Sequence, residues 1–218
     1  MAALDQEILL RINTDWTGPA MDRFMCIATS ISLWIPFLIL IGILVALFGG
    51  FRGRAALVCV GLSIGLVDGV LTNNVKDLVQ RPRPYQLIDG LRMPELARVK
   101  PTILAVGMPL RLGRSAAEIG PYGGRSLPSG HAANNFALAT VVTLFYRRWG
   151  WLYFLPASIV AYSRIYVAAH WPSDILVSVF MGSGGALIVT ALAAWAWNRW
   201  APRWVPALAL RHPDLLPA

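Results

Sequence analysis

The sequence IATSISLWIPFLILIGILVALF, residues 27–48, contains no charged side chain and decides the class of fold. An α-helix needs about 20 mostly apolar residues to cross the hydrocarbon core of a bilayer, and this stretch is long enough. Of the 218 residues in the chain, 56% are hydrophobic and only 14% are charged, whereas a soluble domain carries about 25% charged residues. The composition therefore indicates an integral membrane protein, and it excludes a disordered tail, a nucleic-acid-binding domain and a secreted disulfide scaffold.

Four further apolar segments follow the first and predict an all-α, polytopic transmembrane bundle. They are residues 55–75, 132–146, 149–168 and 175–197. Before the first span, Leu4, Ile8, Leu9 and Ile12 recur at helical spacing, so we expect an amphipathic helix at the membrane interface. The prediction is one domain over residues 1–218 with about five spanning helices, or six if the N-terminal helix also spans.

Short loops between the spans carry the arginines that set the orientation. They are Arg52 and Arg54, Arg147 and Arg148, and Arg199 and Arg203. In a five-span arrangement these loops share one side, which the excess of positive charge marks as cytoplasmic. The long loop between the second and third spans then lies outside. Residues 80–128 contribute +5 of the net charge of +8, and anion binding explains that charge. Within this loop, residues 101–110 would lie on the membrane or cap the site.

Glycine and cysteine positions give two further expectations. Gly61, Gly65 and Gly69 recur every four residues in the second span, a spacing typical of close helix packing. Cys26 and Cys59 stand alone in or beside apolar runs, so we expect both to be small buried residues. The sequence has neither zinc-ligand spacing nor a carboxylate cluster suited to Mg²⁺, so neither a metal nor another cofactor is expected.

Three polar clusters lie at the ends of the apolar segments, on the side opposite the arginine pairs. The first, KDLVQRPRP at residues 76–84, holds its arginines on a backbone that proline restricts. The second is LPSGHA at residues 127–132. Ser129 is expected to cap the helix that begins there, and the free N–H groups and dipole of a helix N-terminus attract an anion. Snorkelling cations and an ordinary capped helix are the structural alternatives.

The third cluster, SRIYVAAHWPSD at residues 163–174, connects the fourth and fifth spans. A charged side chain within a membrane span costs free energy, so its presence suggests a functional role. Arg164 is such a residue. Asp174 is near enough in the sequence to hydrogen-bond an imidazole nitrogen of His170. Such a bond fixes the tautomer and makes the other nitrogen a better nucleophile. Together the three clusters predict a phosphate-transfer site.

These clusters resemble the three-part signature of the type 2 phosphatidic acid phosphatase (PAP2) superfamily. The matching residues are Lys76 and, after six residues, Arg83-Pro84; Pro128-Ser129-Gly130-His131; and Ser163-Arg164, His170 and Asp174. The motifs and their connecting spans cover roughly residues 55–189. The resemblance implies a metal-independent, membrane-embedded phosphatase of lipid phosphates, in a superfamily whose members often have six spanning helices.

The resemblance also implies a role for each matching residue. His170 would be the nucleophile that forms a phosphohistidine, Asp174 would orient it, and His131 would protonate the leaving oxygen. The phosphate would be held by Lys76, Arg83, Arg164, Ser129 and Gly130. The remaining histidine, His212, lies in a polar tail and is expected to take no part.

The sequence does not determine which of several lipids is the substrate. Undecaprenyl diphosphate is favoured because an outward-facing site suits recycling of a carrier lipid, and phosphatidate, phosphatidylglycerophosphate and lipid A are alternatives. A phosphotransferase would use the same residues, whereas an anion or lipid transporter lined by Arg164 and Asp68 would leave the histidines and Asp174 unexplained. We expect a bacterial inner membrane protein whose site faces the periplasm. Its partners would be lipid substrates and membrane lipids, not nucleic acid, and the sequence specifies no oligomeric state.

Overall fold

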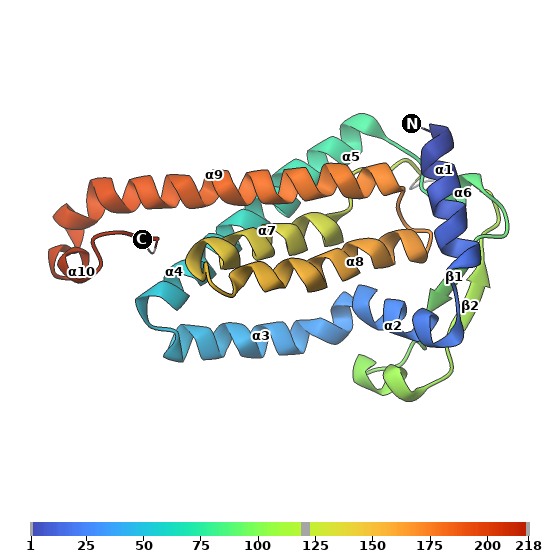
Figure 1. The fold of residues 1–218 in the computed structure, drawn as a ribbon, viewed down its shortest axis with the longest axis horizontal. Coiled ribbons are helices and arrows are strands. Elements are labelled where there is room, and N and C mark those ends of the chain that lie inside the picture. Colours follow the sequence, from blue (N-terminus) through green and yellow to red (C-terminus); the bar gives the residue numbers. More distant parts are fainter. Residues whose placement is uncertain (1, 119–122, 217–218) are drawn as a thin grey trace.

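A computed structural model describes residues 2–118 and 123–216, and most of these residues are helical (Figure 1). The longer helices run along the molecule, and a short helix crosses the bundle at one end. The longer ones are α3 (Ile31–Phe48), α4 (Gly50–Ile64), α7 (Gly130–Phe145), α8 (Phe154–Tyr166) and α9 (Pro172–Trp204). The predicted helical class of fold is confirmed.

Helix length separates the predicted spans into two groups. Three helical runs are long and apolar enough to cross a membrane: α3, α9, and the run from Gly50 that contains α4, the π-helical η2 (Gly65–Thr72) and α5 (Asn73–Val79). By contrast, α7 has 16 residues, and α8 has 13 after the short η4 (Gly150–Tyr153). These three helical runs indicate a membrane protein. The count of five spans stays a prediction.

The apolar side chains of α3 lie mostly outside the core, because Leu33 is its one buried residue. By contrast, α7 packs against α4, α8 and α9. Small residues allow these helices to approach closely. A Cβ on Gly182 of α9 would lie 2.1 Å from the Ala133 carbonyl oxygen of α7, and one on Gly150 would lie 2.4 Å from the Val142 carbonyl oxygen.

The predicted glycine spacing is not where the close packing occurs. A Cβ built on Gly61, Gly65 or Gly69 would meet no described atom within 4 Å. All three residues are exposed, so the prediction of close packing there is wrong. The spacing places the glycines on one side of the helix, but it does not determine whether that side faces a neighbour. Cys26 and Cys59 are buried, as predicted.

The predicted N-terminal helix is present, but its buried side contains polar as well as apolar residues. α1 (Ala2–Leu10) and the π-helical η1 (Arg11–Asp15) cross the end of the bundle (Figure 1). Leu9 and Ile12 are buried in the core as the pattern predicts, whereas Leu4 and Ile8 are exposed. Polar residues on the inward side are also buried, and Asp5 is one of them.

A break divides the first predicted span. α2 (Pro19–Thr29) ends at Ser30, whose backbone takes φ −81° and ψ 89°, and α3 begins at Ile31. The apolar run from residue 27 therefore changes direction after its first residues. The break leaves Thr29 at the end of α2, where its hydroxyl accepts a hydrogen bond from Arg164 Nη1.

The long outer loop has regular structure of its own. It contains the short helix α6 (Pro84–Leu87), β1 (Arg92–Glu95), the 3-10 helix η3 (Thr102–Gly107) and β2 (Arg111–Arg114). The two strands pair antiparallel, with Arg92 opposite Arg114 and Glu95 opposite Arg111. Asp22 of α2 anchors the loop by accepting from Arg92 Nη2 at 2.7 Å and from Tyr166 Oη at 2.6 Å.

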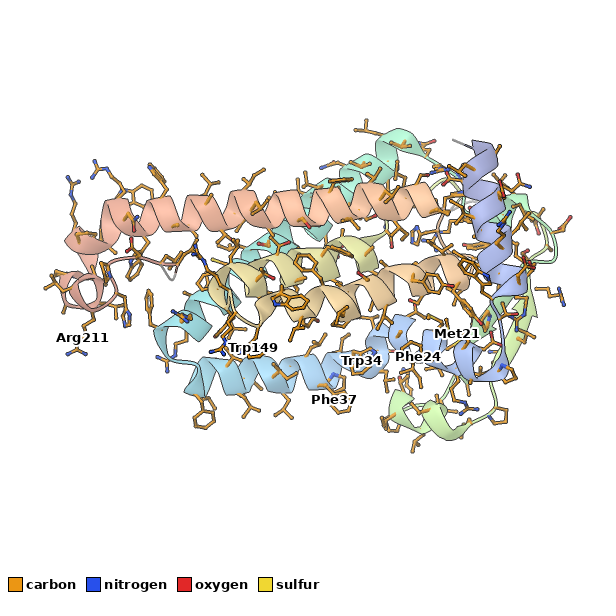
Figure 2. The ribbon with its side chains drawn as sticks, viewed as in Figure 1. Met21, Phe24, Trp34, Phe37, Trp149 and Arg211 are labelled. Atoms are coloured by element: carbon orange, nitrogen blue, oxygen red, sulfur yellow. The ribbon has the colours of Figure 1, made fainter. Side chains whose placement is uncertain are left out.

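The opposite end of the bundle carries α10 (Pro206–Arg211) and the loop arginines. Figure 2 labels Trp149 and Arg211 at this end, far from Met21 and Phe24. Trp195, Trp200 and Trp204 are exposed near the end of α9, as a belt at a membrane interface requires. The His212 ring stacks on Phe51 with a centroid distance of 4.2 Å, which gives this histidine a packing role away from the polar clusters.

The contact between α7 and α9 gives a test of the core. Gly182→Ala should destabilise the protein by about 1–3 kcal/mol, because its Cβ would overpack against the Ala133 carbonyl. Gly184→Ala is the matched control, since a Cβ there meets no described atom within 4 Å. That change should be neutral or stabilising, because alanine favours a helix over glycine. Thermal unfolding in detergent measures both, and equal unfolding temperatures for the two variants would contradict the packing described here.

Candidate active site

The three polar clusters meet at the end of the bundle that α1 crosses (Figure 1). Two hydrogen bonds join segments that are far apart in the sequence. The Ser126 amide donates to the Arg81 carbonyl at 2.9 Å, and Trp171 Nε1 donates to the Pro82 carbonyl at 2.9 Å. The segment after α5, the approach to α7 and the turn between α8 and α9 therefore form one site.

His170 lies in the turn between α8 and α9. After α8 ends at Tyr166, Ala168 takes the left-handed conformation with φ +57°, which costs a non-glycine residue roughly 1–2 kcal/mol. The amides of Ala169 and His170 then both donate to the Arg164 carbonyl, at 3.0 and 3.2 Å. The turn directs His170 inward, where the residue is only 3% exposed.

One hydrogen bond determines the tautomer of His170. Its Nδ1 lies 2.6 Å from the backbone carbonyl oxygen of Ser126. Because a carbonyl can only accept, Nδ1 must carry the proton and Nε2 must hold the free lone pair. Nε2 is therefore the nitrogen that can act as a nucleophile.

Asp174 lies beside this histidine without hydrogen-bonding it. Its Oδ2 lies 3.7 Å from His170 Nδ1, which is too far for a hydrogen bond. The same oxygen accepts from Ser126 Oγ at 2.5 Å and from the Trp171 amide at 3.0 Å, and Oδ1 accepts from Arg81 Nη1 at 2.6 Å. The expected direct bond from Asp174 to the imidazole is thus replaced by Ser126, because the carbonyl of that residue reaches Nδ1 first.

The protonation of His170 follows from its surroundings. Burial of the imidazole, with smaller contributions from the charges of Arg164 and Arg83, lowers the pKa of His170 from 6.5 to about 4, against the opposing effect of Asp174. A neutral imidazole keeps the Nε2 lone pair available at neutral pH. The cations that depress this pKa are the side chains expected to hold a phosphate.

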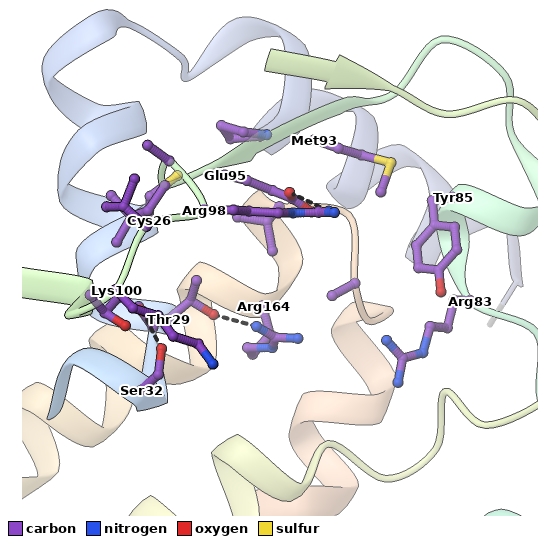
Figure 3. A pocket seen from close by; sticks show the side chains of 18 residues that line it. Cys26, Thr29, Ser32, Arg83, Tyr85, Met93, Glu95, Arg98, Lys100 and Arg164 are labelled. Atoms are coloured by element: carbon purple, nitrogen blue, oxygen red, sulfur yellow. Dashed lines mark hydrogen bonds and ion pairs between the residues drawn. The ribbon is translucent and has the colours of Figure 1, made fainter. Parts of the chain in front are cut away.

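Arg83 and Arg164 come from different elements and line one cavity (Figure 3). The cavity has a volume of about 640 Å³, and Lys100 and Thr102 of the outer loop are also in its wall. Arg83 precedes α6, and Arg164 lies in the last turn of α8 with a buried Nε that has no partner in the part of the chain that the structure describes. Residues 93–100 and Thr102 of the outer loop therefore form part of the wall of the site. Of residues 101–110 only Thr102 lines the cavity, so the expectation that this stretch caps the site stays a prediction.

Lys76 stands on α5, half-buried and within electrostatic reach of Arg83 and Arg164. Three cations thus surround one region, and this arrangement favours an anion. Among residues 2–118 and 123–216, no three His, Cys, Asp or Glu side chains are grouped in a way that could hold a metal ion.

The start of α7 supplies Ser129, Gly130 and His131. Ser129 is the N-cap residue, but its amide donates to Ser178 Oγ at 2.8 Å, so this N–H is not free for a phosphate. Its hydroxyl is buried without a partner among the described residues and remains available as a donor. A Cβ on Gly130 would lie 3.0 Å from Oδ1 of the exposed Asp68 side chain, a close contact that a small rotation of that side chain relieves.

His131 is half-buried and within electrostatic reach of His170 and the three cations. It also lies in the wall of an apolar groove of about 370 Å³ between α2–α3 and α7–α8. Trp34, Phe37 and Ile159 are among the side chains that line this groove. His131 thus stands where the charged region and an apolar surface meet.

The chain is matched over residues 56–201 by the model of the PAP2 superfamily. The chain belongs to the PAP2 superfamily. That match covers the three motifs and most of the bundle, so the resemblance of the motifs is confirmed at the level of the family. The protein is a PAP2 phosphatase of lipid phosphates.

Several known proteins are similar to this PAP2 chain. A lipid A 4'-phosphatase of Bacteroides thetaiotaomicron is 29% identical over 198 residues, which cover 88% of this chain and 78% of the relative. An undecaprenyl-diphosphatase of Sulfolobus acidocaldarius is 39% identical over 59 residues, 27% of this chain and 29% of the relative. The crystal structure of Aquifex aeolicus LpxE superposes with a TM-score of 0.61 at 22% identity, covering 86% of this chain and 95% of that one, and shows that the fold is shared.

Residues outside the motif positions complete the site. Ser126, Arg81 and Thr29 each hydrogen-bond a motif residue, yet none was assigned a role from the sequence. For Arg81 the sequence does offer a signal, because this residue forms the first Arg-Pro step of the RPRP segment. Ser126 and Thr29 have no such signal, because their roles depend on a backbone carbonyl and on the break between α2 and α3.

The protonation of His170 can be measured directly. In a variant with His131→Asn and His212→Asn, ¹⁵N-labelled histidine leaves His170 as the one imidazole to follow by NMR in detergent. We expect its titration midpoint near pH 4, about 2.5 units below the ordinary value of 6.5, and an Nδ1–H tautomer at neutral pH. A midpoint at the ordinary value, or an Nε2–H tautomer, would contradict the burial and the Ser126 hydrogen bond.

Proposed function

We propose that the protein hydrolyses a lipid-linked phosphate through a covalent phosphohistidine on His170. The observation that carries this proposal is the bond from His170 Nδ1 to the Ser126 carbonyl at 2.6 Å. It leaves Nε2 unprotonated on a buried side chain within electrostatic reach of Arg83 and Arg164. A nucleophile beside fixed cations is the arrangement that phosphoryl transfer requires.

In the first step, Lys76, Arg83 and Arg164 hold the phosphate oxygens, and the Ser129 hydroxyl donates to one of them. The N-terminus of α7 at Gly130 adds the positive end of a helix dipole. His170 Nε2 then forms a bond to phosphorus as the bond to the lipid oxygen breaks. These fixed charges stabilise the transferred group without reorganisation during the reaction.

His131 supplies and recovers the proton. Burial, with smaller contributions from neighbouring cations such as Arg164, lowers the pKa of His131 from 6.5 to about 4 in the absence of substrate. The negative charge of the bound phosphate offsets those cations, so His131 takes up its proton with the substrate. Protonated His131 then donates to the leaving lipid oxygen, which departs as a hydroxyl group or, from a diphosphate, as a phosphate monoester. Neutral His131 then removes a proton from a water that attacks the phosphohistidine. The P–N bond breaks, inorganic phosphate is released, and both histidines return to their starting states.

The apolar groove at His131 is the proposed place for the hydrocarbon part of the substrate. Its lining comes from α2, α3, α7 and α8, and it reaches Thr29, which also lines the charged cavity. A lipid whose phosphate sits between the arginines could therefore lay its apolar chain along α3. This arrangement puts the leaving oxygen on the side of His131.

A lipid A type saccharolipid phosphate is the substrate that the comparisons favour. The similarity to the lipid A 4'-phosphatase extends over 88% of this chain, whereas the matches named for undecaprenyl diphosphate cover 27–28%. The cavity of about 640 Å³ also offers more room than one phosphate needs. Undecaprenyl diphosphate, which the orientation argument favours, is the second candidate, and the partial matches to proteins named for it support it.

A phosphate-release assay tests both the chemistry and the substrate. The panel contains a lipid A phosphate, undecaprenyl diphosphate, phosphatidate and phosphatidylglycerophosphate, with EDTA present. We expect release of inorganic phosphate, fastest from the lipid A phosphate, because the three cations and not a metal neutralise the substrate. His170→Ala should lower the rate by on the order of 10² to 10⁴.

His212→Ala is the matched control, because this histidine stacks on Phe51 at the other end of the bundle and should leave the rate unchanged. Near wild-type turnover by His170→Ala would overturn the mechanism. Loss of activity in EDTA that Mg²⁺ restores would overturn its metal independence. Phosphate that appears only on an added lipid alcohol would identify a phosphotransferase.

The site is proposed to face the periplasm of a bacterial inner membrane. The support is the placement of the arginine pairs in the α3–α4 junction, the α7–η4 junction and the end of α9, opposite the motifs (Figure 1). Positive charge in short loops stays on the cytoplasmic side. The motif end then faces outward.

Thiol labelling in spheroplasts tests this orientation. In a background with Cys26 and Cys59 replaced, a single cysteine at Gly107 of η3 should react with a membrane-impermeant reagent in intact spheroplasts. A cysteine at Arg148 is the control and should react only after the membrane is broken. The reverse pattern of labelling would place the site inside and contradict the periplasmic proposal.

A further inference from the structure

A continuous line of hydrogen bonds connects His170 with the N-terminal helix. His170 Nδ1 bonds the Ser126 carbonyl at 2.6 Å, and Ser126 Oγ donates to Asp174 Oδ2 at 2.5 Å. Arg81 Nη1 donates to Asp174 Oδ1 at 2.6 Å, and Arg81 Nη2 donates to Asp5 Oδ2 at 2.7 Å. The line therefore runs from the proposed nucleophile to Asp5 of α1 through three residues, Ser126, Asp174 and Arg81, each from a different segment.

The electrostatics of this line centre on Arg81. Asp174 is fully buried and Asp5 is 5% exposed, and a buried carboxylate is costly unless it is paired and hydrogen-bonded. Arg81 pairs with both carboxylates at once. A guanidinium suits this task because its donors lie in a rigid fork and it does not lose its proton, whereas an ammonium is a single point charge.

Further contacts fix the position of the guanidinium. Arg81 Nη1 also donates to Ser173 Oγ at 2.7 Å, and its guanidinium lies 5.4 Å from the centre of the Trp171 ring. Trp171 in turn is held by the carbonyl of Pro82. Arg81 is thus held against the first turn of α9, which contains the carboxylate that it supports.

Asp5 holds the start of α9 from outside that helix. Its Oδ1 accepts from the Ser173 amide at 2.9 Å, and its Oδ2 accepts from Ser173 Oγ at 2.5 Å. The first amides of a helix have no partner within the helix, so α1 supplies one to α9. Asp174 is the next residue, and its position depends on this cap.

We propose that Arg81 and Asp5 are positioning residues for phosphoryl transfer. They hold the Asp174 carboxylate, which holds Ser126, whose carbonyl keeps the proton of His170 on Nδ1. The N-terminal helix is therefore part of the machinery of the enzyme, although it touches no reacting atom. This inference rests on the proposed role of His170 as the nucleophile.

Steady-state kinetics of purified variants test the proposal. Arg81→Ala should lower kcat by on the order of 10²-fold with KM nearly unchanged, because small misplacement of a reacting group costs about that much. Asp5→Asn keeps an oxygen that can accept from the Ser173 amide and removes the charge that pairs with Arg81. It should therefore lower kcat less, and it should add little in the Arg81→Ala background, since the charge that it removes acts through Arg81. Added ethylguanidinium should restore part of the kcat of Arg81→Ala but none in His170→Ala.

Two further variants complete the design. Glu7→Gln is the matched control, because Glu7 lies on the same helix in an exposed ion pair with Arg11 at 2.8 Å, and its kcat should equal that of wild type. Ser126→Ala keeps the backbone carbonyl but removes the link to Asp174, and it should lower kcat by about tenfold. This variant and Asp5→Asn carry the test if Arg81→Ala does not fold.

The outcomes separate this inference from the proposed function. An Arg81→Ala or Ser126→Ala enzyme with wild-type kcat, beside an inactive His170→Ala enzyme, would overturn the inference alone. Fully additive losses from Asp5→Asn and Arg81→Ala would also overturn it, because independent effects require no shared line. An active His170→Ala enzyme would instead overturn the proposed function.

Discussion

The buried carboxylate of Asp174 is the constraint on which the rest of the site depends. A charge with no access to water must be compensated by protein groups, and here the compensation comes from different parts of the chain. Arg81 arrives from the segment after α5, Ser126 from the approach to α7, and the Trp171 amide from the start of α9. Satisfying one carboxylate therefore assembles all three motif segments, and the orientation of His170 follows from that assembly.

The fold places this carboxylate where a bundle can tolerate it. Apolar and small residues fill the interior between α7 and α9, where Gly182 meets Ala133, and this interior offers few partners for a charge. Helix ends, in contrast, present free amides and carbonyls, and the motifs lie at helix ends. The same end offers an apolar groove beside His131 and a cavity lined by Arg83. A substrate with an apolar tail and an anionic head fits that combination of surfaces.

Much of the site could be predicted because its chemistry is local in the sequence. The motifs predict the phosphate-binding and histidine residues without a structure, through the spacing from Lys76 to Arg83, the PSGH segment ending at His131 and the spacing from His170 to Asp174. The apolar stretches likewise predicted the helical class of fold. Each of these signals lies within one segment, so a sequence displays it directly.

The interactions between segments could not be predicted. Asp5 looked like one of several acids in a polar N-terminal stretch, and its pairing with Arg81 requires the packing of α1 across the bundle. The motif predicted a hydrogen bond between Asp174 and His170, but His170 bonds the backbone carbonyl of Ser126 instead. A sequence motif records side chains and cannot show which backbone carbonyl an imidazole will meet. The spacing of Gly61, Gly65 and Gly69 predicted a close helix contact, but these glycines face away from the other described helices. Periodicity shows that residues share one side of a helix, and it does not show whether another helix packs against that side.

The position of the phosphoryl group on the enzyme tests the account most directly. The enzyme is mixed with a ³²P-labelled lipid phosphate and quenched within one turnover under conditions that preserve a P–N bond. The labelled peptide is then mapped by mass spectrometry, and its phosphohistidine isomer is identified against standards. Because Nδ1 of His170 is committed to the Ser126 carbonyl, the account predicts label on Nε2 of His170. Label on Nδ1, or on His131, would contradict it.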